Sequence, residues 1–357
     1  QAEDGIRDVE RSRGLGDVYK RQVLMHLEAG EGTNVSDEVG GLTGTNADAW
    51  DDGEDVGVKE LWYEHTTTYM DYKMQFTVGK LDIARFFDKN AVANDEETQF
   101  MADIFVNNIA INWPEGLAHS YVPGARLTIS PHSLVDINLG IFDANDDWED
   151  IFNNLFSIGE LVVKPTIFGL KGNYRLYGWH DNRRHVEYND ITLFRGLGMA
   201  LIVEDNEESY GFGISFDQEV CKKTGLTVFC RYGYRDDDTA AVDGNIAALY
   251  NAASLPELLG IEHTWSVGFS LPGKCWNRPE DTFAMACGMA ILNDDYEDVL
   301  RLQGIDPGDE YRVEAYYRYK INDKLYVTPD IQYVTNLNGD DDNEDIVIFG
   351  LRTHLVF

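Results

Sequence analysis

The last twelve residues of the chain constrain its fold more than any other stretch. Apolar side chains recur at every second position from Ile346 to Phe357, and this period of two is typical of a β-strand with one apolar face. Soluble sheets protect their exposed edge strands with charged residues or proline, which this stretch lacks on its apolar face. A closed barrel in a lipid bilayer needs such a strand, because every backbone polar group must be paired there. The alternative is a core strand of a soluble β-sandwich. The apolar face consists of Val347, Phe349, Leu351, Thr353, Leu355 and Phe357.

The charge of the chain narrows its possible partners. The 357 residues include 63 acidic and 29 basic residues, which gives a formal net charge of -34. Nucleic acids and anionic membrane surfaces attract basic proteins, so we expect neither as a partner. No apolar run reaches the roughly 18 residues that a transmembrane helix needs, and the longest, residues 283–292, contains a glycine. If the chain lies in a membrane, it crosses as strands.

The first 21 residues differ from the rest. They contain no apolar stretch of the kind found in signal peptides. Their opening letters, QAEDGIRD, look like the translation of a sequencing adapter. We therefore expect residues 1–21 to be a non-native segment and residues 22–357 to form a β-barrel. On this interpretation the native leader and an N-terminal hairpin are missing.

Short alternating segments fill the chain from Val23 onward, and the connections between them alternate strictly between short turns and long loops. The acidic clusters, such as 236–238 and 340–342, fall almost wholly in the long loops. Short turns at one rim and long loops at the other are typical of outer-membrane barrels. The pattern predicts about fourteen strands here and about sixteen in the complete protein. The predicted strands are 23–30, 56–67, 72–81, 125–129, 134–142, 160–169, 173–181, 210–220, 226–235, 263–271, 283–292, 311–321, 325–333 and 346–357.

The two faces of the predicted strands support a transmembrane antiparallel β-barrel, which is an all-β fold. In residues 311–321, Tyr311, Val313 and Ala315 alternate with Arg312 and Glu314. A polar interior with an apolar exterior requires lipid outside and water inside.

Several motifs together resemble a known family. They begin with Val78-Gly79-Lys80-Leu81-Asp82, continue through Asp88-Lys89-Asn90 and Ala93-Asn94-Asp95-Glu96, and end with Gly350-Leu351-Arg352. The chain from Val23 to Phe357 resembles the carbohydrate-selective porins of the OprB family. The resemblance implies an outer-membrane channel of roughly sixteen strands, in the bacterial outer membrane, through which monosaccharides such as glucose pass by facilitated diffusion. Further matching stretches are Thr98-Gln99-Phe100, Gly172-Asn173-Tyr174-Arg175, Trp179, Phe229-Cys230-Arg231-Tyr232-Gly233, Glu314-Ala315-Tyr316-Tyr317 and Thr328-Pro329-Asp330-Ile331-Gln332-Tyr333.

The connection 82–121 is the strongest candidate for a constriction loop. It is too long for an ordinary barrel loop and carries Arg85, Asn90 and Asn94 among several aromatic residues. Folded into the barrel, its amides could bind sugar hydroxyls and its aromatic rings could stack on sugar C–H faces. Long ordered loops are usually functional. The alternative is a lid on the surface.

Alternation also places arginines, carboxylates and aromatic residues on the lumen side of the strands. Such a mixture suits a neutral polyhydroxylated solute, because the guanidinium fork offers paired hydrogen bonds while nearby carboxylates cancel the field. The alternative is that these pairs brace the barrel wall. The candidates are Glu60, Trp62, Glu64, Arg126, Arg175, Trp179, Arg231, Glu314, Arg318 and Arg352.

The remaining candidates for special chemistry are few. Cys221 and Cys275 fall in short turns of neighbouring hairpins, so we predict a disulfide between them, with free thiols as the alternative. The acidic stretch 338–344 lacks the spacing of an EF-hand loop, so we assign no metal site and expect no cofactor. Residues 213–217 lack the closing glycine of a nucleophile elbow, and we do not expect an enzyme.

Three functions fit the sequence. The first is a channel for small sugars; the alternatives are a general cation-selective porin, favoured by the acidic balance, and an outer-membrane hydrolase. As further partners we expect outer-membrane lipid, lipopolysaccharide bridged by divalent cations, and the barrel-assembly machinery, which would bind the terminal Phe357.

Overall fold

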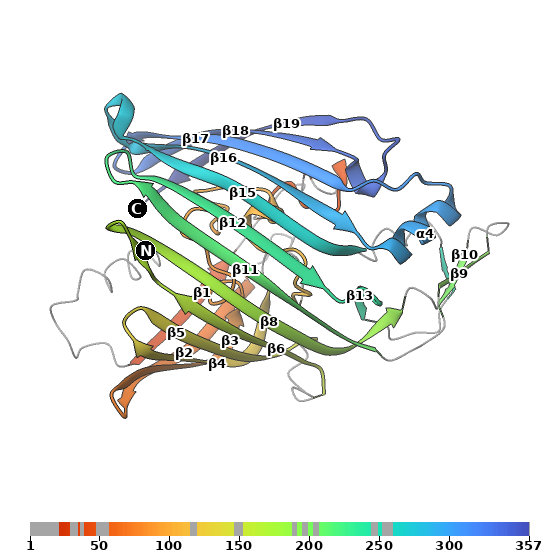
Figure 1. The fold of residues 1–357 in the computed structure, drawn as a ribbon, viewed down its shortest axis with the longest axis horizontal. Coiled ribbons are helices and arrows are strands. Elements are labelled where there is room, and N and C mark those ends of the chain that lie inside the picture. The colour runs from red at the N-terminus through yellow and green to blue at the C-terminus, as the bar shows by residue number, and fades with distance from the viewer. Residues whose placement is uncertain are drawn as a thin grey trace.

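One long antiparallel sheet contains most of the described strands (Figure 1). The computed structural model describes residues 21–28, 35, 39–47, 57–114, 120–145, 153–187, 191–194, 199–202, 207–243, 249–251 and 260–356. The sheet has sixteen strands, of which β7 and β13 lie beside the main path, so fourteen strands follow one another along it. Each strand on the path pairs antiparallel with the next, which confirms the predicted fold class and the predicted number of strands.

The strands on the main path differ from the predicted ones mainly in length. The sheet begins with β1 and ends with β19, and within the described residues β1 pairs with β2 alone and β19 with β18 alone. Their bounds are β1 (Arg21–Glu28), β2 (Gly57–Tyr69), β3 (Tyr72–Asp82), β4 (Tyr121–His132), β5 (Val135–Asp143), β6 (Leu155–Val163), β8 (Leu170–Glu187), β11 (Glu207–Cys221), β12 (Leu226–Arg235), β15 (Ile261–Gly273), β16 (Arg278–Leu292), β17 (Glu310–Asn322), β18 (Leu325–Thr335) and β19 (Ile346–Leu355).

Shorter elements lie in the turns and connections. No helix in the described part of the chain is long and apolar enough to cross a membrane. A separate three-stranded sheet has the order β14-β10-β9. The bounds are β7 (Thr166–Ile167), β9 (Ile191–Phe194), β10 (Met199–Ile202), β13 (Thr239–Asp243), β14 (Leu249–Asn251), α3 (Asp103–Val106), α4 (Asp294–Gln303), η3 (Lys274–Trp276) and η4 (Leu337–Gly339).

The connections between the strands are short at one end of the sheet and long at the other. β2 and β3 are joined by Met70 and Asp71 alone, both with positive φ (48° and 66°), as a tight turn matched to strand twist requires. α4, β9, β10 and β13 lie at the opposite end of the sheet from this turn, with the long connections (Figure 1). The predicted alternation of short turns and long connections is therefore confirmed.

One predicted hairpin is wrong in detail. We expected its turn around residues 170–172, but β7 and β8 turn at Phe168 and Gly169, which both have positive φ. Glycine adopts this conformation at little cost, so the two-residue turn forms there and β8 already begins at Leu170. The predicted strand 160–169 is consequently split between β6 and β7.

Helix α4 is absent from the sequence prediction, which treated residues 293–310 as a loop. Its signals are local: the Asn293 side chain accepts hydrogen bonds from the backbone N–H groups of Asp295 and Tyr296. Gly304 ends the helix in the left-handed conformation. Acidic residues in the first turn favour the helix through its dipole.

The apolar faces of the strands point away from the interior. Along β19, exposed and half-buried residues alternate, and Phe349 and Leu351 are 78% and 71% exposed. The opposite faces are buried, as with Arg312 and Glu314 in β17, which are fully buried. The predicted polar interior and apolar exterior are confirmed. Phe357, on which the sequence argument also rested, lies outside the described residues.

The outward orientation of β18 can be tested at Ile331, which is 42% exposed near the middle of the strand. We expect Ile331→Arg to lower the free energy of unfolding of the barrel in a bilayer by about 2–4 kcal/mol, because the charge enters hydrocarbon. The matched variant Ile331→Val should lower it by no more than about 1.5 kcal/mol. Denaturant titration of folding in lipid vesicles measures both. Equal stability of the two variants would contradict the orientation.

Candidate functional site

Residues 82–114, called here the inward segment, fold into the interior of the curved sheet (Figure 1). Its two ends are tied together where the backbone N–H of Ile83 donates to the carbonyl of Ser120. Phe87, Phe100 and Phe105 of the segment are fully buried. The segment packs into two apolar clusters, one with residues of β2, β5, β6 and β8 and one with residues of β12, β16 and β17. The segment therefore lies inside the curved sheet and not on its surface.

Arg231 of β12 anchors the inward segment. Its side chain is 1% exposed and its Nε lies 2.9 Å from a carboxylate oxygen of Asp88. Its two terminal nitrogens donate to the carbonyl oxygens of Asp88, Ala93 and Phe105 at 2.9–3.0 Å. One arginine thus holds both arms of the segment against the wall. Burial raises the pKa of Asp88, and the Arg231 guanidinium opposes this rise.

Other strands hold the segment in the same way. Glu314 of β17 accepts hydrogen bonds from the backbone N–H groups of Met101 and Ala102 at 2.6 and 2.9 Å. The Asn108 side chain donates to the hydroxyl of Tyr177 in β8 and accepts from Thr264 in β15. These contacts reach opposite parts of the wall, so the segment spans the interior.

A second stretch, residues 40–47, also enters the interior, which the sequence did not predict. Fully buried Arg312 of β17 donates to the Thr43 hydroxyl at 2.7 Å and to the Thr43 carbonyl at 2.5 Å. Glu310 accepts from the backbone N–H of Leu42 at 2.7 Å. The stretch contacts the inward segment where Asp103 N–H donates to the Gly44 carbonyl. Residues 40–47 belong to the connection between β1 and β2, and this part of the connection lies inside the curved sheet.

A polar belt crosses the inner wall, with members on every strand of the main path from β2 to β11. Arg126 donates to Glu64 at 2.7 Å and to Thr128 at 2.8 Å. Thr128 donates to the Asn138 carbonyl oxygen, and the Asn138 amide donates to Glu160, at 2.7 and 2.8 Å. The belt residues are Glu64, Thr77, Arg126, Thr128, Asn138, Glu160, Arg175 and Asp217.

Each arginine near the belt has its own carboxylate. Arg85 of the inward segment lies 2.6 Å from Glu60, Arg126 lies 2.7 Å from Glu64, and Arg175 lies 3.0 Å from Asp217. Within each pair the positive and negative charges cancel. The guanidinium N–H groups remain as hydrogen-bond donors beside the carboxylates. Such a surface offers hydrogen bonds without a strong net field.

Aromatic rings lie beside these charges. The Arg126 guanidinium stands 3.9 Å above the centre of the Phe86 ring, and Trp62 donates its indole N–H to Glu60 at 3.0 Å. Trp62 and Phe86 contact each other edge to face, with ring centroids 6.0 Å apart. The structure thus brings together Glu60, Trp62, Glu64, Arg85 and Arg126, with Arg175 further along the belt.

The other predicted site residues have different surroundings. Arg231 and Glu314 are buried against the inward segment, and Asn94 donates within the segment, to Val106 and Asn107. The remaining contacts are those of Asn90 with Ser215 and the Phe216 carbonyl, Trp179 with Phe156, Arg318 with the Tyr326 ring, and Arg352 with the Glu96 and Gln99 carbonyls. These residues contact the inward segment, the wall or each other in the structure.

The sequence analysis missed four residues near the belt: Asn138, Glu160, Asp217 and Lys89. Asn138 and Glu160 alternate with apolar neighbours, and strand parity alone could have found them. Lys89 gives no such signal, because it lies in an irregular segment. Its side chain is exposed to the lumen, and the structure describes no ion pair or hydrogen bond of its ammonium group.

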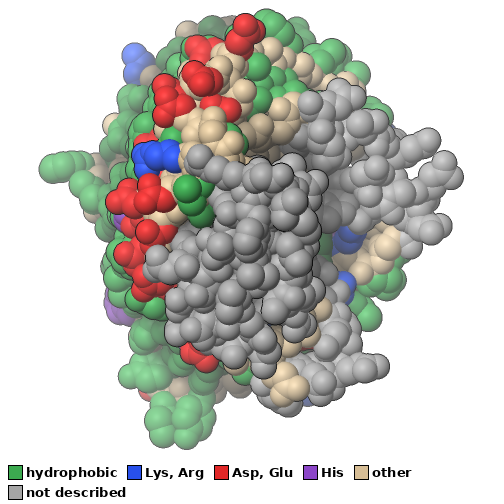
Figure 2. All heavy atoms as spheres, turned by 90° about the vertical axis from the view of Figure 1, so that its right-hand side faces the viewer, with side chains coloured by type: hydrophobic (Ala, Val, Ile, Leu, Met, Phe, Trp, Pro, Cys, Tyr) green, Lys and Arg blue, Asp and Glu red, His purple; other side chains and the backbone are tan. Residues whose placement is uncertain are grey.

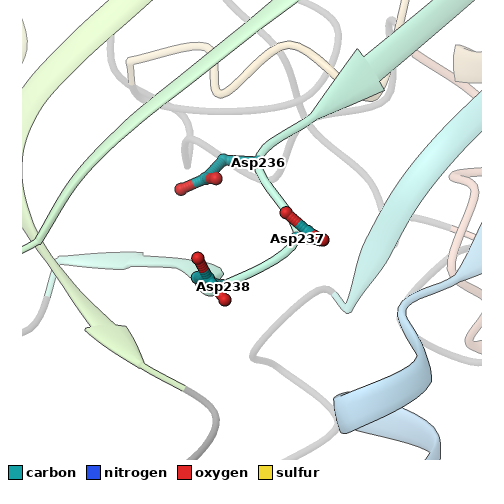
Figure 3. Close-up of side chains that lie close together, drawn as sticks. All are labelled: Asp236, Asp237 and Asp238. Carbon is teal, nitrogen blue, oxygen red and sulfur yellow. The ribbon is translucent and has the colours of Figure 1, made fainter.

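Acidic side chains gather at the rim that bears the long connections. Figure 2 looks onto this end and shows them along one border. The carboxylate oxygens of Asp236, Asp237 and Asp238 lie within 4.8 Å of one another (Figure 3). Partial burial and the two neighbouring carboxylates raise the pKa of Asp236, which a hydrogen bond from Thr239 opposes. The acidic clusters at 51–52 and 146–147 lie outside the described residues.

All four cysteines are free thiols in the structure, so it does not contain the predicted bond between Cys221 and Cys275. Cys221 ends β11, Cys275 lies in η3 after β15, and β12 runs between these two strands in the sheet. The two turns do approach each other, because Gly225 lies beside Lys274. Neighbouring turns were therefore predicted correctly, but the thiols are not joined.

A sheet with an apolar outside, a polar inside and an inward segment defines an outer-membrane β-barrel channel. A family model described as "Carbohydrate-selective porin, OprB family" matches residues 7–357. Porin B of Pseudomonas aeruginosa is 23% identical over 348 residues, which cover 85% of this chain and 72% of that protein. The high pH structure of Pseudomonas putida OprB has the same fold, with a TM-score of 0.77 and 17% identity over 94% of this chain and 82% of that one.

The chain belongs to the OprB family of carbohydrate-selective porins. It is a channel of the bacterial outer membrane and not an enzyme, so the soluble-sandwich and hydrolase alternatives are wrong.

The anchoring role of Arg231 predicts a coupled effect. We expect Arg231→Met to destabilise the barrel by about 3–5 kcal/mol, because Asp88 stays buried without its partner. The released segment should also raise single-channel conductance. The double variant Arg231→Met with Asp88→Asn should recover part of the stability while the conductance stays high. No recovery of stability in the double variant, or wild-type conductance in both variants, would contradict the anchoring role.

The cysteines provide a simpler test. We expect alkylation of the denatured protein without reductant to label all four thiols, which mass spectrometry can count. Prior reduction should leave the count unchanged. A chain that gains two labels only after reduction would instead support the predicted disulfide.

Proposed function

We propose that this channel passes monosaccharides such as glucose by facilitated diffusion. The observation that carries the proposal is the polar belt with its three arginine–carboxylate pairs. A neutral sugar offers hydroxyl groups that donate and accept, and the belt presents both kinds of partner along the wall. Because the pairs cancel their charges, a neutral solute need not compete with strongly held ions.

The aromatic residues fit the same solute. Phe86 and Trp62 lie beside Arg126 and Arg85, so a sugar ring could place its C–H face on an aromatic ring and its hydroxyls on the charged groups. Passage requires binding that is favourable on entry yet weak enough for release, and hydrogen bonds shared with water meet this condition. Arg85, Arg126, Arg175, Glu60 and Glu64 are the residues that we assign to the sugar.

A general cation-selective porin is the second candidate, and the acidic rim is the observation that favours it. Asp237 and Asp238 are exposed at the end bearing the long connections, where they would attract cations from bulk water. A solute that enters from this end meets the acidic rim before it reaches the polar belt. Attraction of cations at the rim and binding of sugars at the belt can therefore coexist.

Two further partners belong to this proposal. The acidic rim carboxylates could be bridged by divalent cations to the phosphates of lipopolysaccharide. Phe357, an aromatic residue of the alternating stretch 346–357 in the sequence, could provide a recognition signal for the barrel-assembly machinery.

Glucose block of single-channel current in a planar bilayer tests the function. We expect glucose to reduce the wild-type current in a saturable manner, and Arg126→Gln to weaken this block by roughly tenfold, because one charged hydrogen-bond donor is lost. Lys222→Gln, in an exposed short turn, should leave the block unchanged and serves as the control. Cation selectivity with no block by glucose would contradict a sugar channel and support the general porin.

A further inference from the structure

Lys89 is the exposed cation of the inward segment. Its carbonyl accepts a hydrogen bond from Ser215 of β11, and the next residue but one, Ala91, donates its N–H to Asp217. These bonds fix the Lys89 backbone against the inner wall beside the pair formed by Arg175 and Asp217. The side chain extends into the lumen, where the structure describes no partner for its ammonium group.

None of the described groups around Lys89 forms an ion pair with its ammonium group. Arg85, Arg126 and Arg175 are close enough to act on it electrostatically, but each is already paired with a carboxylate. Glu160 is the remaining nearby acid, and none of its oxygens lies within 4.0 Å of the Lys89 nitrogen among the described ion pairs. Lys89 is therefore available to a solute.

Glu160 offers the complementary half of a site. It is 3% exposed, one of its oxygens accepts from Asn138 at 2.8 Å, and the other, Oε2, has no hydrogen-bond partner. A buried acceptor without a partner is costly, so a hydroxyl donor that reached it would be favoured. An exposed cation of the inward segment and a buried, unpaired acceptor of β6 thus lie close enough to interact electrostatically.

We propose that this pair lets the channel bind sugars that carry a carboxylate, such as uronic and aldonic acids, and prefer them over neutral sugars. The sugar carboxylate lies on the Lys89 ammonium and a hydroxyl donates to Oε2 of Glu160. The inference rests on the proposed sugar channel and adds a second class of substrate to it. Charge-assisted hydrogen bonds are stronger than neutral ones, so Lys89 would distinguish the acid from its neutral counterpart.

The protonation of Lys89 provides an independent readout. Enclosure within the barrel and the charges of Arg126, Arg175 and Arg85 lower the pKa of Lys89 to about 8, and Glu160 opposes the shift. The other charged groups around this space, Glu60, Glu64 and Asp217, are held by the arginines. The ammonium is present below pH 8 and is lost above it, so the preference for acid sugars should fall as pH rises through 8.

Glucose and glucuronate form the matched pair of probes, since they differ at one ring substituent. The measurement is the ratio of their dissociation constants from single-channel block, for the wild type, Lys89→Gln, Lys89→Arg and the control Lys222→Gln. We expect glucuronate to bind the wild type more tightly, and Lys89→Gln to reduce this preference by roughly five- to tenfold. Lys89→Arg and Lys222→Gln should retain it. Between pH 6.5 and 9.5 the preference should fall in the wild type and stay constant in Lys89→Arg.

The outcomes separate the two proposals. If glucose fails to block the wild type, the proposed function is wrong. If glucose blocks but glucuronate is not preferred, or Lys89→Gln keeps the preference, the inference about Lys89 is wrong and the sugar channel stands. Loss of the preference in Lys89→Gln together with its retention in Lys89→Arg supports the inference.

Discussion

The interior of this barrel depends on the buried contact between Arg231 and Asp88. A guanidinium removed from water must find partners for its charge and its N–H groups, and Arg231 finds a carboxylate and three carbonyl oxygens. Because those oxygens belong to separate parts of the inward segment, satisfying one side chain fixes a whole loop. Glu314 repeats this arrangement on the far wall, with acceptor oxygens in place of donor nitrogens.

A loop that is fixed in this way lies against the polar belt, where Phe86 stacks on Arg126 and Ala91 donates its N–H to Asp217. Two apolar clusters surround the inward segment, and Arg85 and Lys89 project from it toward charged groups of β2, β4 and β6. The donors and acceptors stand ready before a solute arrives, because their side chains are held by ion pairs. Preorganisation of this kind lowers the ordering cost of binding. A passive channel benefits, since weak and rapid binding is sufficient for passage.

Much of the fold follows from the sequence because a period of two specifies a strand and its two faces at once. The strand 226–235 was predicted with its correct bounds for this reason. The lumen positions of Glu60, Glu64 and Arg126 follow from the same parity. Local rules fail where the partner is distant in sequence.

The interior elements illustrate that limit. Nothing near Leu42 or Thr43 indicates that this stretch meets Glu310 and Arg312, nearly 270 residues later. Arg231 was predicted to face the lumen, and it does face inward, but the inward segment covers it. The alternation of residues along a strand tells which face a side chain is on. It does not tell which other segment of the chain covers that side chain. The exposed Lys89 was missed because it lies in an irregular segment, where the alternation of a strand gives no signal.

The early and late parts of the chain are joined inside the barrel, and this has a consequence for how the molecule forms. Residues 40–47 leave β1 and meet β17 and β18, where Gln332 donates to the Thr45 carbonyl at 2.8 Å. Contacts between residues so distant along the chain form slowly, because a long loop must close first. The sheet can grow strand by strand through neighbouring hairpins, whereas the interior contacts of residues 40–47 must wait until β17 and β18 are in place. Completion of the lumen is then a late event in assembly, which couples a working pore to the arrival of the last strands.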